Sequence, residues 1–273
     1  MAIFQFAALA SSSKGNSALV SFDGMAYLID LGLSEKDLQR KLACLGLSVC
    51  EIRGLFATHL HEDHLPERAF KFCLRNKIPL TLHERNYDAA RARCPVVGEL
   101  MMRGLLRPVG ETFLKLGRWC VKGFELPHDS DGLCNGFSIF YSKRKLLTMA
   151  TDLGHAPDAL FDEFSRAQIV VIESNHDVEM LKQAPRPLHV KQRILSDRGH
   201  LSNEQCAAFL ARLCRSWRPD MVLLAHLSQE CNTPQLALTS ARHGLRCSGW
   251  HDSIQLDYCR QCEPGPAVNI VCE

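Results

Sequence analysis

The chain has 273 residues, of which 46% are hydrophobic and 23% are charged, and its formal net charge is +2. This composition is ordinary for a globular protein, and the length is enough for one sizeable core. A net charge so close to zero gives no support to a nucleic-acid partner, so only local clusters of basic residues can argue for one. No apolar stretch reaches the length of a membrane span.

Thirteen cysteines are scattered along the chain without a regular framework. We expect mostly free, buried thiols in a reducing compartment, and therefore a cytoplasmic protein. Cys259 and Cys262 form a C-x-x-C pair that lacks a clear second pair. We favour two free thiols there over the alternative, a structural zinc site. The apolar N-terminus lacks a charged leading region, so we expect a first core strand rather than a signal peptide.

The first half of the chain predicts alternating strands and helices. Strands are expected at residues 3–9, 18–22, 26–30, 54–57 and 78–82. Asp23-Gly24 predicts a hairpin turn between the second and third of these strands. Helices are expected at 35–45 after the capping residue Ser34, at 66–75 with Pro66 in the first turn, and at 84–93.

The second half repeats this alternation. Strands are expected within 105–127, broken by Gly110, Gly117 and Gly123, then as a hairpin of 136–141 and 145–151, and at 168–172 and 221–225. Helices are expected at 158–164, at 203–215 with Ser202 as cap, and at 234–243. Two runs of strands with helix-bearing segments suit two packed sheets with helices outside. We expect a single domain over residues 1–273, with the tail 249–273 unassigned.

The densest group of possible metal ligands follows the strand 54–57. His59, His61, Asp63 and His64 lie within six residues. Alternate spacing cannot place these side chains on one helix face, but it fits a loop at the carboxyl end of a strand. Four ligands exceed the usual protein share of one catalytic ion, so two adjacent ions are plausible. The alternative is a polar surface turn, which the density of ligands argues against.

Three later residues repeat this placement just past a strand. They are His128, Asp152 and His226. Taken singly, each would more often be a capping or hydrogen-bonded residue. Their shared position at strand ends favours metal binding instead, and the carboxylate of Asp152 suits a bridge because it can give one oxygen to each ion.

These motifs resemble the metallo-β-lactamase superfamily from Asp30 to His226. The strings around Ser11–Ser17, Glu173–Asp177, Gly199–Asn203 and Ala225–Ser228 are similar to the YycJ/WalJ group, compact relatives of tRNase Z, RNase J and PhnP. The resemblance implies an α/β fold, an αββα four-layer sandwich of two mixed β-sheets with helices outside. It also implies two divalent metal ions, for which the ligand types admit zinc, manganese or iron.

The resemblance assigns roles by position. His59, His61 and His128 would hold the first ion, and Asp63, His64 and His226 the second, with Asp152 bridging. Asp30 would support the histidine loop, although the start of a turn explains it equally well. His200 would be the general acid and Glu173 its orienting partner, with Asp63 also counted among the catalytic residues. The alternatives are a helix N-terminal His200 and a solvated Glu173; His176 is ambiguous.

The expected function is a dinuclear hydrolase, most simply a phosphodiesterase or exonuclease that cleaves DNA or RNA ends. Residues 182–198 hold five cations against one acid, Asp197, and could guide a phosphate backbone. Arginines between 85 and 107 form a second basic region, for which a solvated face is at least as good an explanation. A small-molecule hydrolase of cyclic phosphodiesters, lactones or thioesters is the alternative. A second alternative is a metal-stabilised nucleic-acid-binding or regulatory module without catalysis.

Overall fold

The computed structural model describes residues 2–22, 24–109, 113–249, 253–265 and 267–272. The chain folds into two compact units. The first unit comprises Met1–Thr112, Ser130–Asn135 and Arg260–Glu273, and the second comprises Phe113–Asp129 and Gly136–Cys259. The single domain expected from the sequence stays a prediction, and each unit is described by itself below.

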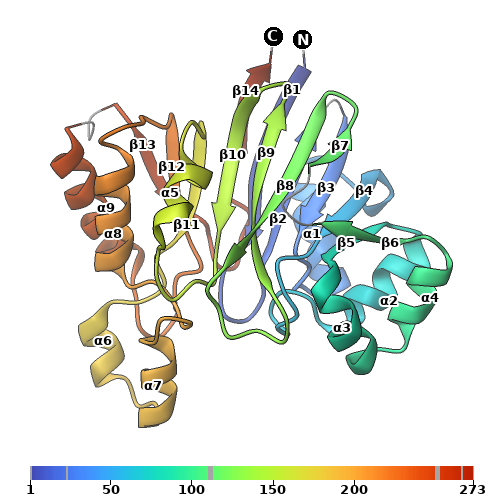
Figure 1. Cartoon of the computed structure of the whole chain (residues 1–273), viewed down its shortest axis with the longest axis horizontal. Helices are drawn as coiled ribbons and strands as arrows, with labels where there is room; N and C mark the ends of the chain where they lie inside the picture. The colour runs from blue at the N-terminus through green and yellow to red at the C-terminus, as the bar shows by residue number, and fades with distance from the viewer. Residues whose placement is uncertain (1, 23, 110–112, 250–252, 266, 273) are drawn as a thin grey trace. The chain divides into compact units, whose positions relative to one another are not determined.

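A seven-stranded mixed sheet forms the first unit, in the order β14-β1-β2-β3-β4-β5-β6 (Figure 1). Its strands are β1 (Ala2–Ala10), β2 (Ser17–Phe22), β3 (Met25–Ile29), β4 (Ile52–Phe56), β5 (Leu80–His83), β6 (Leu106–Val109) and β14 (Val268–Cys272). Strands β14 to β3 pair antiparallel, whereas β3 to β6 pair parallel. The parallel half therefore sends the carboxyl ends of β3 and β4 to the same edge.

Helices of the first unit are joined to this sheet by one apolar core. They are α1 (Glu35–Cys44), α2 (Glu67–Asn76), α3 (Tyr87–Arg93) and α4 (Val96–Met102), with short 3₁₀ turns at Val49–Glu51 and Glu84–Asn86. Leu38 and Leu42 of α1 and Phe70 of α2 are fully buried in the same cluster as Leu55 of β4. Their spacing of three or four residues within a helix gives each helix one apolar face.

A second seven-stranded mixed sheet forms the other unit, in the order β13-β12-β11-β10-β9-β8-β7. Its strands are β7 (Leu114–Leu116), β8 (Trp119–Leu126), β9 (Cys134–Tyr141), β10 (Arg144–Ala150), β11 (Ile169–Glu173), β12 (Met221–Ala225) and β13 (Gln255–Tyr258). Strands β10 to β13 pair parallel, with Ala150 opposite Ile172 and Ile172 opposite Leu224. The residues that follow β10, β11 and β12 therefore start from one edge of the sheet.

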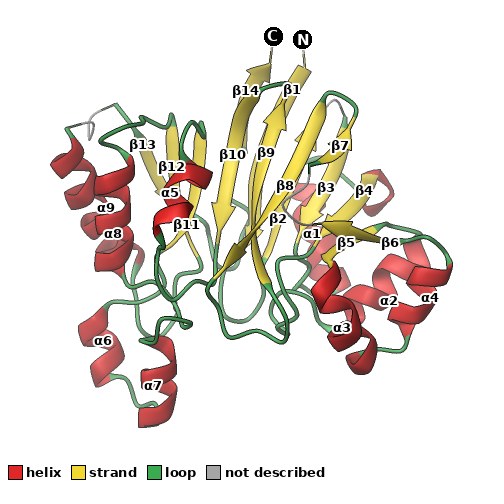
Figure 2. Ribbon diagram, in the orientation of Figure 1, coloured by secondary structure: helices red, strands yellow, loops and turns green. Residues whose placement is uncertain are grey.

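The helices of the second unit are α5 (Asp158–Phe164), α6 (Val178–Gln183), α7 (Leu188–Ile194), α8 (Asn203–Leu213) and α9 (Pro234–Ser248). Helices α8 and α9 pack against each other, and α9 contacts β13 (Figure 2). Gly244 allows this contact, because a Cβ there would lie 2.2 Å from the carbonyl oxygen of Ala207. Helices α6 and α7 form a short helical pair between β11 and α8.

The structure confirms the predicted fold class, two mixed sheets with flanking helices. The predicted strands and helices occur in the predicted order, but helices α4 and α7 were not predicted, and further corrections follow. Gly123 does not break a strand, since it lies inside β8. Helix α9 runs to Ser248 rather than 243, and the tail supplies β13 and β14. Asp23 and Gly110 lie outside the described residues.

Two further findings bear on the composition. None of the helices described is long and apolar enough to cross a membrane. Among the described residues, none of the thirteen cysteines forms a disulfide, Cys259 and Cys262 included.

Candidate metal centre

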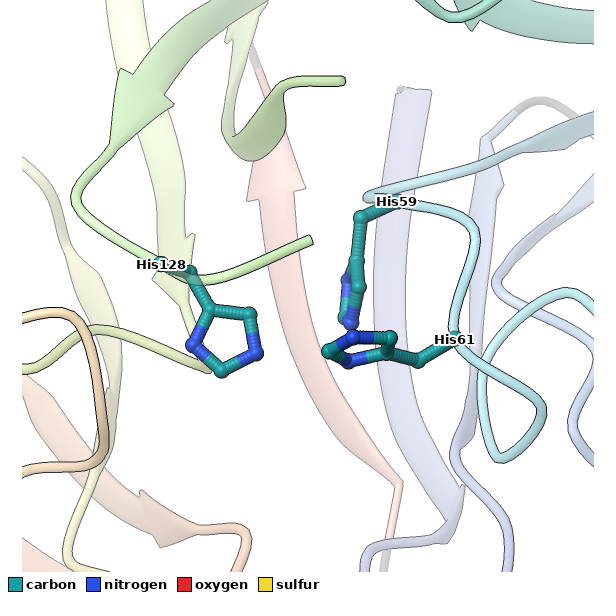
Figure 3. A group of neighbouring side chains, drawn as sticks. All are labelled: His59, His61 and His128. Atoms are coloured by element: carbon teal, nitrogen blue, oxygen red, sulfur yellow. The ribbon is translucent and has the colours of Figure 1, made fainter. Parts of the chain in front are cut away.

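The histidine loop of the first unit follows β4 directly. His59 and His64 are fully buried, whereas His61 and Asp63 are partly exposed. The ring of His59 lies 4.6 Å from that of His61 and 4.2 Å from that of His64, centroid to centroid. Figure 3 shows His59 and His61 leaving the same loop. The alternative of an exposed polar turn therefore does not describe His59 or His64.

A buried carboxylate, Asp30, holds this loop from the end of β3. Its Oδ1 accepts the backbone N–H of Thr58 at 2.8 Å, and its Oδ2 accepts the Thr58 hydroxyl at 2.8 Å. The same Oδ2 lies 2.7 Å from Nδ1 of His64. These bonds fix the orientation of the His64 ring, which is the role that a supporting residue plays for a metal ligand.

Asn16 and Gly32 hold the other end of the loop, and the sequence had not singled out either residue. The Asn16 backbone N–H donates to the Asp63 carbonyl at 2.7 Å, and its side-chain amide donates to Asp63 Oδ2 at 3.1 Å. A Cβ on Gly32 would lie 1.8 Å from the Asp63 carbonyl oxygen. Asn16 belongs to the Ser11–Ser17 string that carried part of the resemblance, and that string was its only signal.

Four side chains of the second unit gather at the edge where β10, β11 and β12 end. One ligand atom from each of Asp152, Glu173, His200 and His226 lies within 4.8 Å of the others. Nδ1 of His226 is 3.2 Å from Oδ1 of Asp152. Two carboxylates and two imidazoles thus meet in a buried, polar cluster.

Glu173 is the centre of this cluster. Its Oε1 accepts hydrogen bonds from Nδ1 of His200 at 2.9 Å and of His226 at 2.7 Å. Its Oε2 accepts the backbone N–H groups of Leu153 and Leu201 at 3.2 and 2.9 Å. Burial alone would raise the pKa of Glu173, but the charge and hydrogen bonds of the two histidines outweigh it and lower the pKa to about 2. Glu173 is therefore not a solvated loop carboxylate.

His128 follows β8 and is also drawn in Figure 3. It is 2% exposed, and its Nδ1 lies 3.0 Å from the carbonyl oxygen of Gly199. Burial lowers the pKa of the His128 imidazole. A neutral ring with Nδ1 bound to a carbonyl presents Nε2 as its ligand atom, the arrangement typical of metal-binding histidines.

Three of these residues share an unusual backbone conformation. Asp30, Asp152 and His226 have φ values of +60°, +66° and +55°, in the left-handed region that side chains other than glycine rarely adopt. Each stands at or just past the end of a buried strand. Such strain is concentrated at functional sites, where the surrounding structure holds it in place.

His176 lies in the loop that follows Glu173, the last residue of β11. It is 1% exposed, and within the described part of the chain neither ring nitrogen has a hydrogen-bond partner. Burial lowers its pKa to about 4, so the ring is neutral near pH 7. His176 is thus a buried residue directly before Asp177, the N-cap of α6.

Three of the five cations in the basic segment 182–198 are paired with carboxylates, so fewer are available to bind a phosphate than the sequence indicated. Lys182, Arg186 and Arg193 form ion pairs with Glu179, Glu230 and Asp129. The cations of this segment without such a pair among the described residues are Lys191 and Arg198. The segment therefore presents less net charge to a phosphate backbone than a count of its cations predicts.

The donor set of each unit fits a divalent metal ion. Imidazole nitrogens and carboxylate oxygens, largely buried, are the ligands that zinc and manganese prefer in proteins. The buried carboxylates Asp30 and Glu173 supply the hydrogen bonds that fix such ligands.

The chain matches the family model described as "Beta-lactamase superfamily domain" over residues 27–227. It belongs to the beta-lactamase superfamily. Among curated relatives of this superfamily, an exodeoxyribonuclease YycJ of Bacillus anthracis is 30% identical over 246 residues, which cover 90% of each chain. An exodeoxyribonuclease WalJ of Streptococcus pneumoniae is 30% identical and covers 86% of this chain and 85% of its own. The predicted superfamily and its YycJ/WalJ group are thus confirmed.

Solved structures of the superfamily share the fold. YhfI of Bacillus subtilis aligns with a TM-score of 0.70 at 11% identity, covering 98% of this chain and 100% of its own. The short form of human tRNase Z aligns with a TM-score of 0.62 at 15% identity, covering 96% and 98%. Together with the relatives, the family confirms the prediction of a metal-dependent hydrolase that binds divalent ions.

Proposed function

We propose that this protein is an exodeoxyribonuclease that hydrolyses phosphodiester bonds at DNA ends. The observation that carries the proposal is Glu173, which hydrogen-bonds both a proposed metal ligand, His226, and a proposed proton donor, His200. The relatives named exodeoxyribonuclease support DNA, rather than RNA, as the first substrate to test. A cytoplasmic location is part of the proposal, since thirteen cysteines without a disulfide among the described residues suit a reducing compartment.

The proposed centre holds two divalent ions, zinc or manganese, with iron as a further candidate. His59, His61 and His128 would bind one ion, and Asp63, His64 and His226 the other, with Asp152 between them. When bound, such ions polarise the phosphate and lower the pKa of water, so that hydrolysis proceeds near neutral pH. The buried supports Asp30 and Glu173 would keep His64 and His226 in the orientation that binding requires.

His200 would protonate the leaving oxygen. Its Nδ1 donates to Glu173, so the proton to be transferred resides on Nε2. Its side chain is 20% exposed, whereas Glu173 is fully buried, so His200 can touch a substrate and Glu173 cannot. Glu173 would stabilise the protonated ring before transfer and hold its orientation.

The test uses the protein loaded with Mn²⁺ and end-labelled single- and double-stranded DNA and RNA. We expect terminal cleavage of DNA, and no cleavage above background by the His61→Ala/Asp152→Ala variant. A comparison of DNA with bis(4-nitrophenyl) phosphate tests His200, because a nitrophenolate leaves without a proton. His200→Ala should lower the rate on DNA by about 10²–10⁴-fold but spare the nitrophenyl ester. Equal losses on both substrates would contradict the assigned role.

A small phosphodiester is the second candidate substrate. The pairing of Lys182, Arg186 and Arg193 with carboxylates favours it, because it leaves a weaker basic surface for a long backbone. Cyclic nucleotides added to the same panel separate the two. Turnover of a cyclic nucleotide without any release from DNA ends would replace the nuclease proposal.

A further inference from the structure

We propose that Arg198 binds a second phosphate of the substrate, beside the one that is hydrolysed. The proposal rests on the proposed nuclease function and assigns the residue that would make the enzyme prefer a chain with a neighbouring phosphate. It concerns the second unit alone.

The guanidinium of Arg198 is anchored at one edge. Its Nε and Nη2 donate to the His128 carbonyl oxygen at 3.3 and 2.9 Å. A guanidinium carries five N–H donors in a rigid plane, so three remain for an anion. Arg198 is an exposed residue.

The backbone of Arg198 is fixed beside the proposed catalytic residues. Its carbonyl oxygen accepts the Asp129 N–H at 3.1 Å, and it stands two residues before His200. A Cβ on Gly154 would lie 2.4 Å from the Arg198 nitrogen, so the loop after β10 is packed against this backbone. A side chain that starts from a fixed backbone and is held by a carbonyl loses little conformational entropy on binding.

Position argues for a neighbouring phosphate. Arg198 is held at the backbone carbonyl of His128, whereas the imidazole of His128 is the proposed ligand. The guanidinium therefore lies beside the proposed centre and not among its ligands. In DNA, the next phosphate is the anion found beside the one that is cleaved.

Charge separates Arg198 from the other arginines of its segment. Arg186 and Arg193 each bind a carboxylate, but no carboxylate in the described ranges forms an ion pair with Arg198. A guanidinium bound to a neutral carbonyl keeps its full charge for a phosphate, which it can contact through two parallel N–H···O bonds.

The experiment compares thymidine dinucleotides with and without a terminal phosphate. The substrates are dTpdT, its 5′-phosphorylated form, its 3′-phosphorylated form, and bis(4-nitrophenyl) phosphate, each with the Mn²⁺-loaded protein. We expect the wild type to prefer one phosphorylated dinucleotide. Arg198→Ala should lower kcat/KM on that substrate by about 10- to 100-fold, mainly through KM, and leave the other substrates within about twofold. Arg198→Lys should restore part of the preference, because it returns the charge without the planar donors.

Arg212→Ala is the matched control. Arg212 lies on α8 and pairs with Asp158 of α5, and its loss should leave the preference unchanged. An equal loss on all four substrates in Arg198→Ala would overturn the proposal and leave Arg198 as a support for the His128 loop. An unchanged preference would overturn it too. A wild type that hydrolyses only the nitrophenyl ester would refute the nuclease function itself.

Discussion

The two units assemble their polar sites in opposite ways. The first unit collects His59, His61, Asp63 and His64 in one loop, so the ligands are neighbours in sequence before they are neighbours in space. The second unit collects Asp152, Glu173, His200 and His226 from four segments spread over 75 positions of the chain, and β10, β11 and β12 bring three of them to one edge. A local site needs only its motif, whereas a dispersed one depends on strand order and register.

The units nevertheless use one device. In each, a single buried carboxylate at a strand end binds the Nδ1 atom of a histidine: Asp30 binds His64, and Glu173 binds His226 and His200. Glu173 holds more groups than Asp30 does, because it fixes two rings and accepts two backbone N–H groups. The dispersed site therefore concentrates on one residue the support that the contiguous loop receives from three, Asp30, Asn16 and Gly32.

Removing one proposed ligand from each unit is the strongest test of this comparison. If both units serve one centre, His61→Ala and Asp152→Ala should each lower DNA hydrolysis by roughly a thousandfold, since metal ions supply several kcal/mol of transition-state stabilisation. Each should also lower the bound metal measured by elemental analysis.

His155→Ala serves as the control, because His155 bonds the Asp197 carbonyl and has no proposed role at the metals. Near wild-type activity in Asp152→Ala, with its metal content kept, would show that the histidine loop acts without the second unit.

Weakening the two supporting carboxylates should have smaller effects. Asp30→Asn and Glu173→Gln keep the shape but lose the charge, and we expect losses of about 10- to 100-fold in metal affinity or activity. Glu173→Gln should be the more severe, because the amide oxygen can replace Oε1 but the amide nitrogen cannot accept the backbone N–H groups of Leu153 and Leu201 that Oε2 accepts. Metal titration followed by calorimetry, combined with kcat on DNA, checks both variants. If Glu173→Gln keeps the metal affinity and the kcat of the wild type, the second unit does not depend on its buried carboxylate more than the first unit depends on Asp30.

Local signals in the sequence predicted much of this structure. The histidine motif, the cap at Ser202 and the strand 221–225 follow from spacing, a capping side chain and an apolar run, and all three agree with the structure. Placement at strand ends also singled out Asp152 and His226 before their distance was known. The resemblance, rather than spacing, assigned Glu173 and His200 to each other.

The sequence failed where partners are distant. Helix α4, helix α7 and the strands β13 and β14 were not predicted, because their periodicity is short and their stability comes from neighbours. Gly123 was misread as a break, since its buried place in β8 depends on the sheet and not on its own propensity. Gly32 gave no signal and Asn16 only that of the Ser11–Ser17 string, because their contacts with Asp63 bridge dozens of positions.

Gly32 offers a test of how tightly the contiguous loop is held. In Gly32→Ala the new methyl group must displace the Asp63 backbone, and we expect a loss of about 1–3 kcal/mol in the free energy of unfolding, measured by urea denaturation.

The matched control is Gly98→Ala in α4, where nothing lies within 4 Å of the new Cβ. Alanine in a helix interior should stabilise the protein by roughly 0.5–1 kcal/mol. A Gly32→Ala variant as stable as the wild type would mean that the loop can shift away from Gly32 at little cost.

His176, in the loop after Glu173, makes the free energy of unfolding depend on pH. Burial is the main cause that lowers the pKa of His176 to about 4 in the folded protein. The charge of His200 lowers this pKa further, whereas the carboxylates of Glu173, Glu204 and Asp177 raise it. Between that value and an unfolded pKa near 6.5 the unfolded chain binds more protons, so stability falls as pH falls. From pH 7 to pH 5 this one group should remove about 2 kcal/mol.

His176→Leu should remove this contribution to the pH dependence of the free energy of unfolding. Leucine should lose no hydrogen bond, because the ring makes none within the described structure. The measurement is urea denaturation at pH 7, 6 and 5 in a chelator, which removes metal binding from the comparison. His189→Leu is the control, because His189 is exposed on α7 and is solvated in both states. The contradicting outcome is that His176→Leu and the wild type show the same change in the free energy of unfolding from pH 7 to pH 5 while both stay folded. In that case other groups cause the loss of stability in acid, and the His176 ring is not the buried, unbonded imidazole described above.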